Sequence, residues 1–183
     1  KNAILMCETA ANVIGVENSR IGVCSTGWIG YQLPIDDICH SIPLVIEGST
    51  VDGGDIASRA IMTTDTKEKT FFKEYKDGNG VQFCVGAIAK GAAMLQPNMA
   101  TMLAFITTDA SVMREVLQQS LSRAAQQSFN KLTVDGAQST NDTVLLLSSE
   151  KTTEVETDSF ENAVLEACQS LAKQMCDDAE GST

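Results

Sequence analysis

The sequence predicts an α/β domain in which strands and helices are mixed along the chain and pack in layers. The tetrad 77–80, Asp-Gly-Asn-Gly, separates two β-rich runs and favours the positive φ angles of a hairpin turn. Two further apolar runs, 102–107 and 144–147, have the length and composition of buried strands. Because apolar residues recur at helical spacing after each of these runs, neither a helical bundle nor a β-sandwich fits the pattern.

In the N-terminal part of the chain the pattern predicts three elements before the hairpin. Mixed apolar and small residues over 1–14 indicate a helix, and 21–24 reads as a short buried strand. Asp36 and Asp37 are expected to cap a second helix, because their carboxylates can accept free backbone N–H groups. A third helix is predicted over 56–62.

The remaining elements follow in order: strands over 71–75, 81–88 and 102–107, a long helix, a strand over 144–147 and a C-terminal helix. Thr108 or Asp109 is predicted to cap the long helix. Asp158 and Glu161 form the capping-box pattern at the start of the last helix.

Composition limits the classes of partner. The chain has 183 residues, enough for one sizeable domain, and 43% of them are hydrophobic, so it can bury a core. Its net charge of −11 argues against nucleic acid or an anionic membrane as the main partner. No apolar run approaches the length needed to cross a bilayer.

The six cysteines predict free thiols rather than a disulfide framework or a metal site. None of them forms a Cys-x-x-Cys pair, and the single histidine, His40, cannot build a His-rich site. We therefore expect no metal and a reducing compartment such as the cytoplasm, or the mitochondrial matrix in a eukaryote.

The segment 90–103, KGAAMLQPNMATML, contains the residue most able to carry chemistry. A threonine hydroxyl holds its proton at neutral pH and is normally a poor nucleophile. If the Ala100–Thr101 bond is cut, Thr101 gains a free α-amine that can act as general base for its own hydroxyl. Taken alone, an Ala-Thr pair before an apolar run is usually just the start of a strand.

Several segments closely resemble the ArgJ family of glutamate N-acetyltransferases, also called ornithine acetyltransferases. The first is KGAAMLQPNMATMLAFITTDA at 90–110, and the others, in family order, are CSTGWIGYQLPID at 24–36, AIMTTDT at 60–66 and TVDGAQSTNDTVLLLS at 133–148. The resemblance covers nearly the whole chain, which looks like the middle half of a family member.

The resemblance implies the layered αββα fold of the DmpA/ArgJ-like kind and a precursor that cuts itself between Ala100 and Thr101. Residues 1–183 would then form one partial acetyltransferase domain. Residues 1–100 would end the α chain, residues 101–183 would start the β chain, and an α2β2 assembly is expected.

The resemblance also assigns roles in catalysis. Thr101 is the nucleophile and contacts substrate, while the Thr26 hydroxyl and the Gly27 backbone N–H form an oxyanion hole. From the residues alone, Ser25-Thr26-Gly27 after a predicted strand is in the common case only a turn.

Three further residues match substrate-binding positions of the family: Thr63, with Thr64 as the other choice of register, Lys90 and Glu180. Lys90 would hold a substrate carboxylate and lower the pKa of the Thr101 amine, and Glu180 would bind the ornithine ammonium. From the residues alone, Thr63 is equally a helix end, whereas such a lysine is most often solvated and such a glutamate is more readily an acid in a tail.

The activity implied is acetyl transfer from N-acetylornithine to glutamate through an acetyl-threonine intermediate in arginine biosynthesis, releasing ornithine. No cofactor is required, and acetyl-CoA is left open as a second acetyl donor. Two alternatives remain: an amidohydrolase or aminopeptidase with the same N-terminal nucleophile, and a fragment without activity.

Overall fold

The computed structural model describes residues 1–27, 30–92, 102–132 and 139–179. These residues belong to two compact units, 1–55 and 56–183, and each unit is described by itself. No helix in the described part of the chain is long and apolar enough to cross a membrane.

The first unit consists of two packed helices and an extended segment. Helix α1, Asn2–Ile14, ends at Gly15, whose φ of 79° needs the freedom of glycine. It packs against α2, Ile35–Glu47, after a short 3₁₀ turn η1, Asn18–Arg20. The predicted first helix is thus confirmed.

Two predictions in the first unit are wrong. Residues 21–24 form no strand, because a strand needs the backbone groups of a neighbouring strand and the described residues of this unit include none. Asp36 and Asp37 do not cap α2: the helix begins one residue earlier, with Pro34 at the capping position, and both acids lie in its first turn.

The second unit is built on a mixed four-stranded sheet, which confirms the predicted α/β class. Helix α3, Gly54–Ala60, runs across the unit boundary and precedes the sheet. The strands are β1, Lys69–Lys76, β2, Gln82–Lys90, β3, Leu103–Thr108, and β4, Thr143–Ser148, in spatial order 1-2-3-4. β2 is antiparallel to both of its neighbours, β1 and β3, whereas β4 runs parallel to β3.

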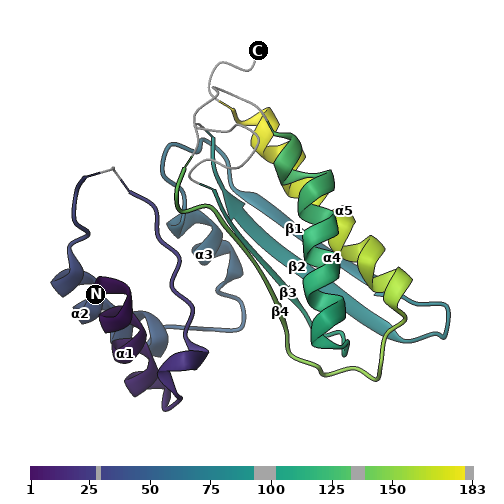
Figure 1. Ribbon diagram of the computed structural model, residues 1–183, viewed down its shortest axis with the longest axis horizontal. Coiled ribbons are helices and arrows are strands. Elements are labelled where there is room, and N and C mark those ends of the chain that lie inside the picture. The colour runs from purple at the N-terminus through teal and green to yellow at the C-terminus, as the bar shows by residue number, and fades with distance from the viewer. Residues whose placement is uncertain (28–29, 93–101, 133–138, 180–183) are drawn as a thin grey trace. The chain divides into compact units, whose positions relative to one another are not determined.

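Helix α4, Arg114–Gln127, supplies the crossover that a parallel strand pair requires, and a 3₁₀ turn η2, Phe129–Lys131, follows it. Helix α5, Thr157–Asp177, closes the chain. The two helices lie side by side on one face of the sheet (Figure 1), which we call the helix face; the opposite face is the outer face.

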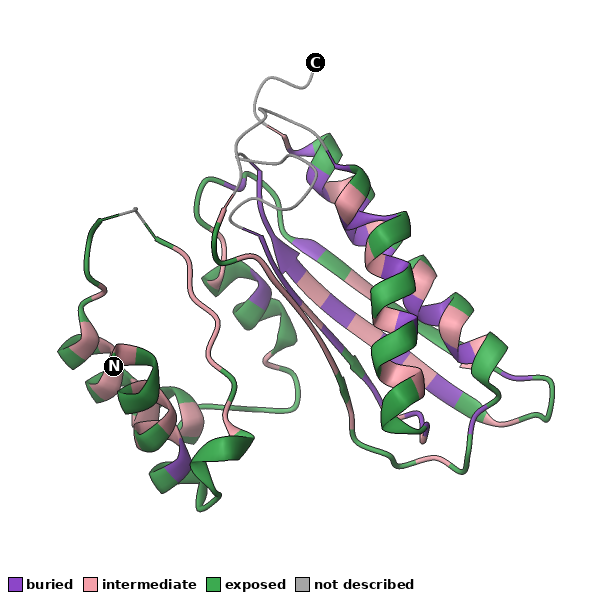
Figure 2. Ribbon diagram, in the orientation of Figure 1, coloured by how far each residue is buried: buried purple, intermediate pink, exposed green. Residues whose placement is uncertain are grey.

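The hydrophobic core lies between the sheet and these helices (Figure 2). Along β2, Phe83, Val85, Ala87 and Ala89 are buried against the helices and alternate with half-buried residues on the outer face. Helix α5 meets them with buried residues at helical spacing: Phe160, Val164, Ala167, Cys168, Leu171 and Met175. The period of two in the strand and of 3.6 in the helix directs both apolar sets to one core.

The predicted caps of the two long helices are also wrong. Helix α4 begins only at Arg114, because Thr108 is the last residue of β3 and the Asp109 carboxylate accepts a hydrogen bond from the Cys84 N–H instead. Helix α5 begins at Thr157 without a side-chain cap. For Asp109, a distant backbone N–H took the carboxylate that local sequence had assigned to a helix end.

Candidate functional site

A buried lysine marks the candidate site. Lys90 is the last residue of β2, lies opposite Leu103 at the start of β3, and is only 1% exposed. The alternation along β2 places it on the outer face. Its Nζ donates to the Thr63 hydroxyl over 3.4 Å, so the structure brings together two of the predicted substrate-binding residues.

The charge state of Lys90 is set by opposing effects. Burial lowers the pKa of Lys90, because the ammonium loses hydration, while the negative charges of Asp65 and Asp142 raise it; the net direction is downward. A lysine in this position has lost much of its hydration and gains most from an anionic group brought to it.

Asp65 ties the two sides of the site together. Its Oδ2 accepts the Thr63 N–H at 3.1 Å, and its Oδ1 accepts the Gly91 N–H at 2.6 Å. Burial raises the pKa of Asp65, but hydrogen bonds from Lys69, Gly91 and Thr63 lower this pKa by a larger amount. The net direction is downward, so the carboxylate is ionised at neutral pH. One buried anion thus fixes the backbone beside both Thr63 and Lys90.

The turn after Lys90 depends on glycine. Gly91 has a φ of 145°, a conformation that side-chain-bearing residues rarely adopt. Its N–H points to Asp65, as described above, so the turn direction and the hydrogen bond are set by the same residue.

On the helix face, a second buried lysine anchors the end of α5. Lys69 Nζ donates to Asp65 at 2.6 Å and to Asp178, and all three side chains are almost fully buried. Asp178 also accepts hydrogen bonds from the Thr66 hydroxyl and the backbone N–H groups of Thr66 and Lys67. This triad joins the end of α5 to the segment that carries Thr63.

Asp142 contributes a third carboxylate to the site. Its Oδ1 accepts the Met102 N–H at 2.6 Å, and its Oδ2 is buried. Burial raises the pKa of Asp142, whereas the Met102 N–H and the charge of Lys90 lower it; the net direction is upward.

Some predicted site residues are not joined to this cluster. Thr26, half-buried, and Gly27, exposed, lie in the extended segment of the first unit, which the structure describes separately. A Cβ at Gly27 would lie 3.6 Å from Leu33, which is ordinary contact. The predicted cleavage pair, Ala100 and Thr101, and the predicted ligand Glu180 fall outside the described residues.

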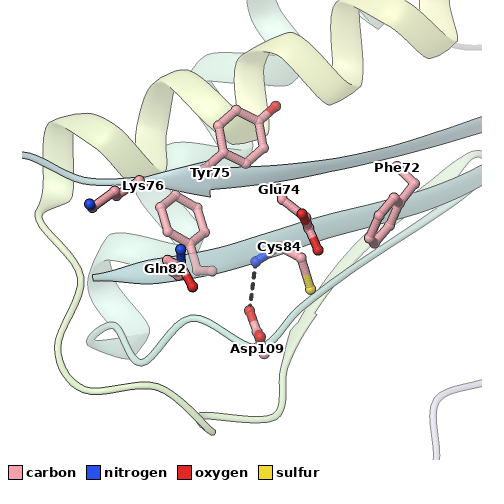
Figure 3. Close-up of a pocket in the computed structure, with 8 residues that line it drawn as sticks. Phe72, Glu74, Tyr75, Lys76, Gln82, Cys84 and Asp109 are labelled. Atoms are coloured by element: carbon pink, nitrogen blue, oxygen red, sulfur yellow. Dashed lines mark hydrogen bonds between the residues drawn. The ribbon is translucent and has the colours of Figure 1, made fainter. Parts of the chain in front are cut away.

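A cavity of about 550 Å³ lies at the other end of the sheet, beside Phe72, Glu74, Cys84 and Asp109 (Figure 3). Its one thiol is a poor nucleophile, because burial and the Asp109 charge raise the pKa of Cys84. Within the described part of the chain, no group of three or more His, Cys, Asp or Glu side chains is placed to hold a metal ion.

Sequence reasoning missed the carboxylates and the lysine that organise the site: Asp65, Lys69, Asp142 and Asp178. Asp65 lies within the 60–66 segment and Asp142 within the 133–148 segment, and both segments carry the family resemblance. Their place in these segments is the sequence signal that could have identified them. Lys69 and Asp178 are 109 positions apart, and no local pattern joins them.

Comparison with known proteins places this geometry in a family context. The ArgJ family matches residues 1–183. The chain is 45% identical to the arginine biosynthesis bifunctional protein ArgJ of Bifidobacterium longum, over 99% of the chain and 46% of that protein. It is 44% identical to the ArgJ protein of Archaeoglobus fulgidus, over 100% of the chain and 47% of the relative. The chain thus spans about half the length of these curated relatives.

Proposed function

The chain belongs to the ArgJ family, and from this premise we propose that it takes part in arginine biosynthesis by moving an acetyl group from N-acetylornithine to glutamate. The observation that carries the proposal is the buried Lys90 beside Thr63, in register with the strand that starts two residues after Thr101. Its relatives are named arginine biosynthesis bifunctional proteins.

Activation of the nucleophile requires cleavage between Ala100 and Thr101. Residues 1–100 then end one chain, residues 101–183 begin the other, and the two stay associated in an α2β2 assembly with a layered αββα fold. The mixed sheet is compatible with this arrangement, because β2 and β3 lie on opposite sides of the cleavage point in the sequence but pair along six residues.

The proposed transfer is a double displacement. The Thr101 Oγ attacks the acetyl carbonyl carbon of N-acetylornithine while its proton passes to the Thr101 α-amine. The Thr26 hydroxyl and the Gly27 N–H stabilise the oxyanion. Collapse breaks the C–N bond, ornithine leaves with the proton, and an acetyl ester remains on Thr101. The glutamate amine then attacks the ester carbonyl carbon, the C–O bond to Thr101 breaks, and the proton lost by that amine passes through the Thr101 α-amine to Oγ, so N-acetylglutamate leaves and free Thr101 is restored.

Two of the three proposed substrate ligands carry opposite charges, and the third supplies a hydroxyl. The Lys90 ammonium holds a substrate carboxylate, and Thr63 adds a hydroxyl beside it. Glu180 binds the cationic side chain of ornithine. The nearby cation also lowers the pKa of the Thr101 amine, which keeps more of it as free base.

No cofactor enters this reaction, because one amide is exchanged for another through an ester. Acetyl-CoA is a second donor to be tested with the same enzyme. We assign the protein to the cytoplasm, or to the mitochondrial matrix in a eukaryotic source.

Denaturing mass spectrometry with N-terminal sequencing tests the first step: the proposal requires a fragment that begins Thr101-Met102-Leu103. Thr101→Ala should abolish both cleavage and transfer, and Thr101→Ser should retain part of each. Transfer activity in Thr101→Ala would contradict the mechanism. Loss of N-acetylornithine at the same rate without glutamate would instead indicate an amidohydrolase, and an intact wild-type chain a fragment without activity.

A further inference from the structure

Asp142 and Lys90 lie on opposite sides of the first residue of β3. Lys90 is paired with Leu103 across β2 and β3, and Leu103 is paired with Thr143, the residue directly after Asp142. Neighbouring strands lie about 4.8 Å apart, so Asp142 and Lys90 belong to one edge of the sheet. The charge of each also shifts the pKa of the other. A ligand group held by Lys90 is therefore a neighbour of Asp142.

The two oxygens of Asp142 have different surroundings. Oδ1 accepts the Met102 N–H at 2.6 Å, so it is committed to the backbone at the start of β3. Oδ2 is buried and has no hydrogen-bond partner among the residues that the structure describes. Native proteins leave few buried polar atoms without a partner, which makes Oδ2 a candidate contact for a bound ligand.

The surroundings of Asp142 decide whether Oδ2 accepts or donates. Burial raises the pKa of Asp142, whereas the Met102 N–H and the charge of Lys90 lower it, and the net direction is upward. Lys90, on β2, is the charged group that acts on Asp142, and Asp65 acts in turn on Lys90. An anion bound beside Lys90 offsets the positive charge that holds this pKa down. An anionic ligand therefore favours the protonated carboxyl, in which Oδ2 is a hydroxyl donor.

We propose that Asp142 is a further ligand for the substrate carboxylate that Lys90 holds, and that Asp142 takes up a proton from solvent when this carboxylate binds. The inference rests on the proposed function. The Oδ2–H group donates to one oxygen of the substrate carboxylate, and the Lys90 ammonium donates to the same carboxylate. Two carboxyl groups at hydrogen-bond distance cannot both stay ionised, so they share one proton. When the ligand leaves, the proton returns to solvent.

This role has a consequence for the pH dependence of binding. The pKa of Asp142 is higher in the complex than in the free protein, so a proton is taken up only between these two values. Binding is strongest below the lower value and weakens as the pH rises through the window. Asparagine at position 142 would remove this dependence, because its Oδ1 can still accept the Met102 N–H and its Nδ2 is a donor at every pH.

Ornithine is the probe that tests the proposal, because it carries the carboxylate but no acetyl group and binds without turnover. Calorimetric titration in two buffers of different ionisation enthalpy gives the number of protons taken up, at several values between about pH 5 and 8. We expect the self-cleaved wild-type protein to take up as much as about one proton more than Asp142→Asn. The Kd of the wild type should rise with pH, and that of Asp142→Asn should stay level.

Two further variants define the controls. Asp109→Asn is matched to Asp142→Asn, because Asp109 also accepts a strand N–H, that of Cys84 at 2.8 Å, and it should take up protons as the wild type does. Asp142→Ala lacks the donor, so its Kd for ornithine should rise about 10- to 100-fold.

Three results overturn the inference and leave the proposed function standing. They are a wild-type protein that transfers acetyl groups but takes up no more protons than Asp142→Asn, an Asp142→Asn protein whose Kd keeps the wild-type pH dependence, and an Asp142→Asn protein that melts like the wild type but binds no ornithine. A wild-type protein that stays uncleaved or does not bind ornithine contradicts the proposed function, and this inference with it.

Discussion

Two lysines at the same end of the sheet are both buried, but they lie on opposite faces and have different hydrogen-bond partners. On the helix face, Lys69 is enclosed by Asp65 and Asp178 and by the Lys67 carbonyl. On the outer face, Lys90 reaches the Thr63 hydroxyl over 3.4 Å, and burial lowers its pKa. The first arrangement neutralises a charge within the fold, whereas the second holds the lysine to which the proposed function assigns a substrate carboxylate.

The comparison teaches that burial of a charge does not by itself mark a functional site. A buried lysine bound by two carboxylates is a structural element, because removing one member leaves the others uncompensated. A buried lysine that remains sensitive to further negative charge is a better candidate for ligand binding. The predictions below separate these two roles.

The largest effect is expected from Lys69→Met. Two buried carboxylates would lose their common cation, which should lower the free energy of unfolding by about 3–5 kcal/mol, as measured by chemical denaturation. Lys73→Met on the same strand is the control, since Lys73 pairs with Glu166 at the surface and should cost less than about 1 kcal/mol. Equal losses in the two variants would refute the structural role of the triad.

Lys90→Met should separate activity from stability. Loss of the cation should raise KM for the acetylated substrate and reduce kcat/KM about 10- to 100-fold, the value of one or two strong charged contacts. Its unfolding free energy should change little, because a buried cation and its hydration cost are removed together. Lys76→Met, an exposed lysine of β1, serves as the kinetic control. A stability loss as large as that of Lys69→Met would place Lys90 in the structural class.

Acid should weaken the helix-face triad. Although burial raises the pKa of Asp178, its hydrogen bonds to Lys69, Thr66 and Lys67 lower it to about 2 from an ordinary value of 3.8. The stabilisation is therefore complete above pH 3.8 and is lost as the pH falls toward 2, by on the order of 2 kcal/mol. Unfolding curves between pH 5 and about 2 should show this loss in the wild type and a smaller one in Asp178→Asn. Identical slopes would contradict it.

The smallest effect is expected from Gly91→Ala. A φ of 145° is strained for alanine, which should cost about 1–2 kcal/mol. Gly86→Ala, within the strand that precedes this turn, is the control, because its new Cβ would meet Thr107 at 3.5 Å and Phe72 at 3.8 Å, both ordinary contacts. Thermal melting compares the two; a Gly91→Ala protein as stable as Gly86→Ala would show that the turn tolerates a side chain.

Local sequence predicted the regular elements of the second unit well. The hairpin at 77–80, the two apolar runs and the period of α5 all encode their structure in neighbouring residues, and the strands and helices formed where these signals lie. The predicted caps were wrong for the opposite reason. The Asp109 carboxylate could accept an N–H of the following helix or one from a distant strand, and it accepts the Cys84 N–H.

The sequence by itself determined the α/β class, the family resemblance and the nomination of Thr63 and Lys90. These depend on short patterns, whose physical cause lies within a few residues of the chain. Only the tertiary structure decided that Lys90 is buried beside Thr63, that Asp65 holds both backbones, and that Asp142 meets Met102. Burial, charge compensation and pKa depend on which distant groups meet in space, and the side-chain hydrogen bonds that record this join residues 25 to 112 positions apart.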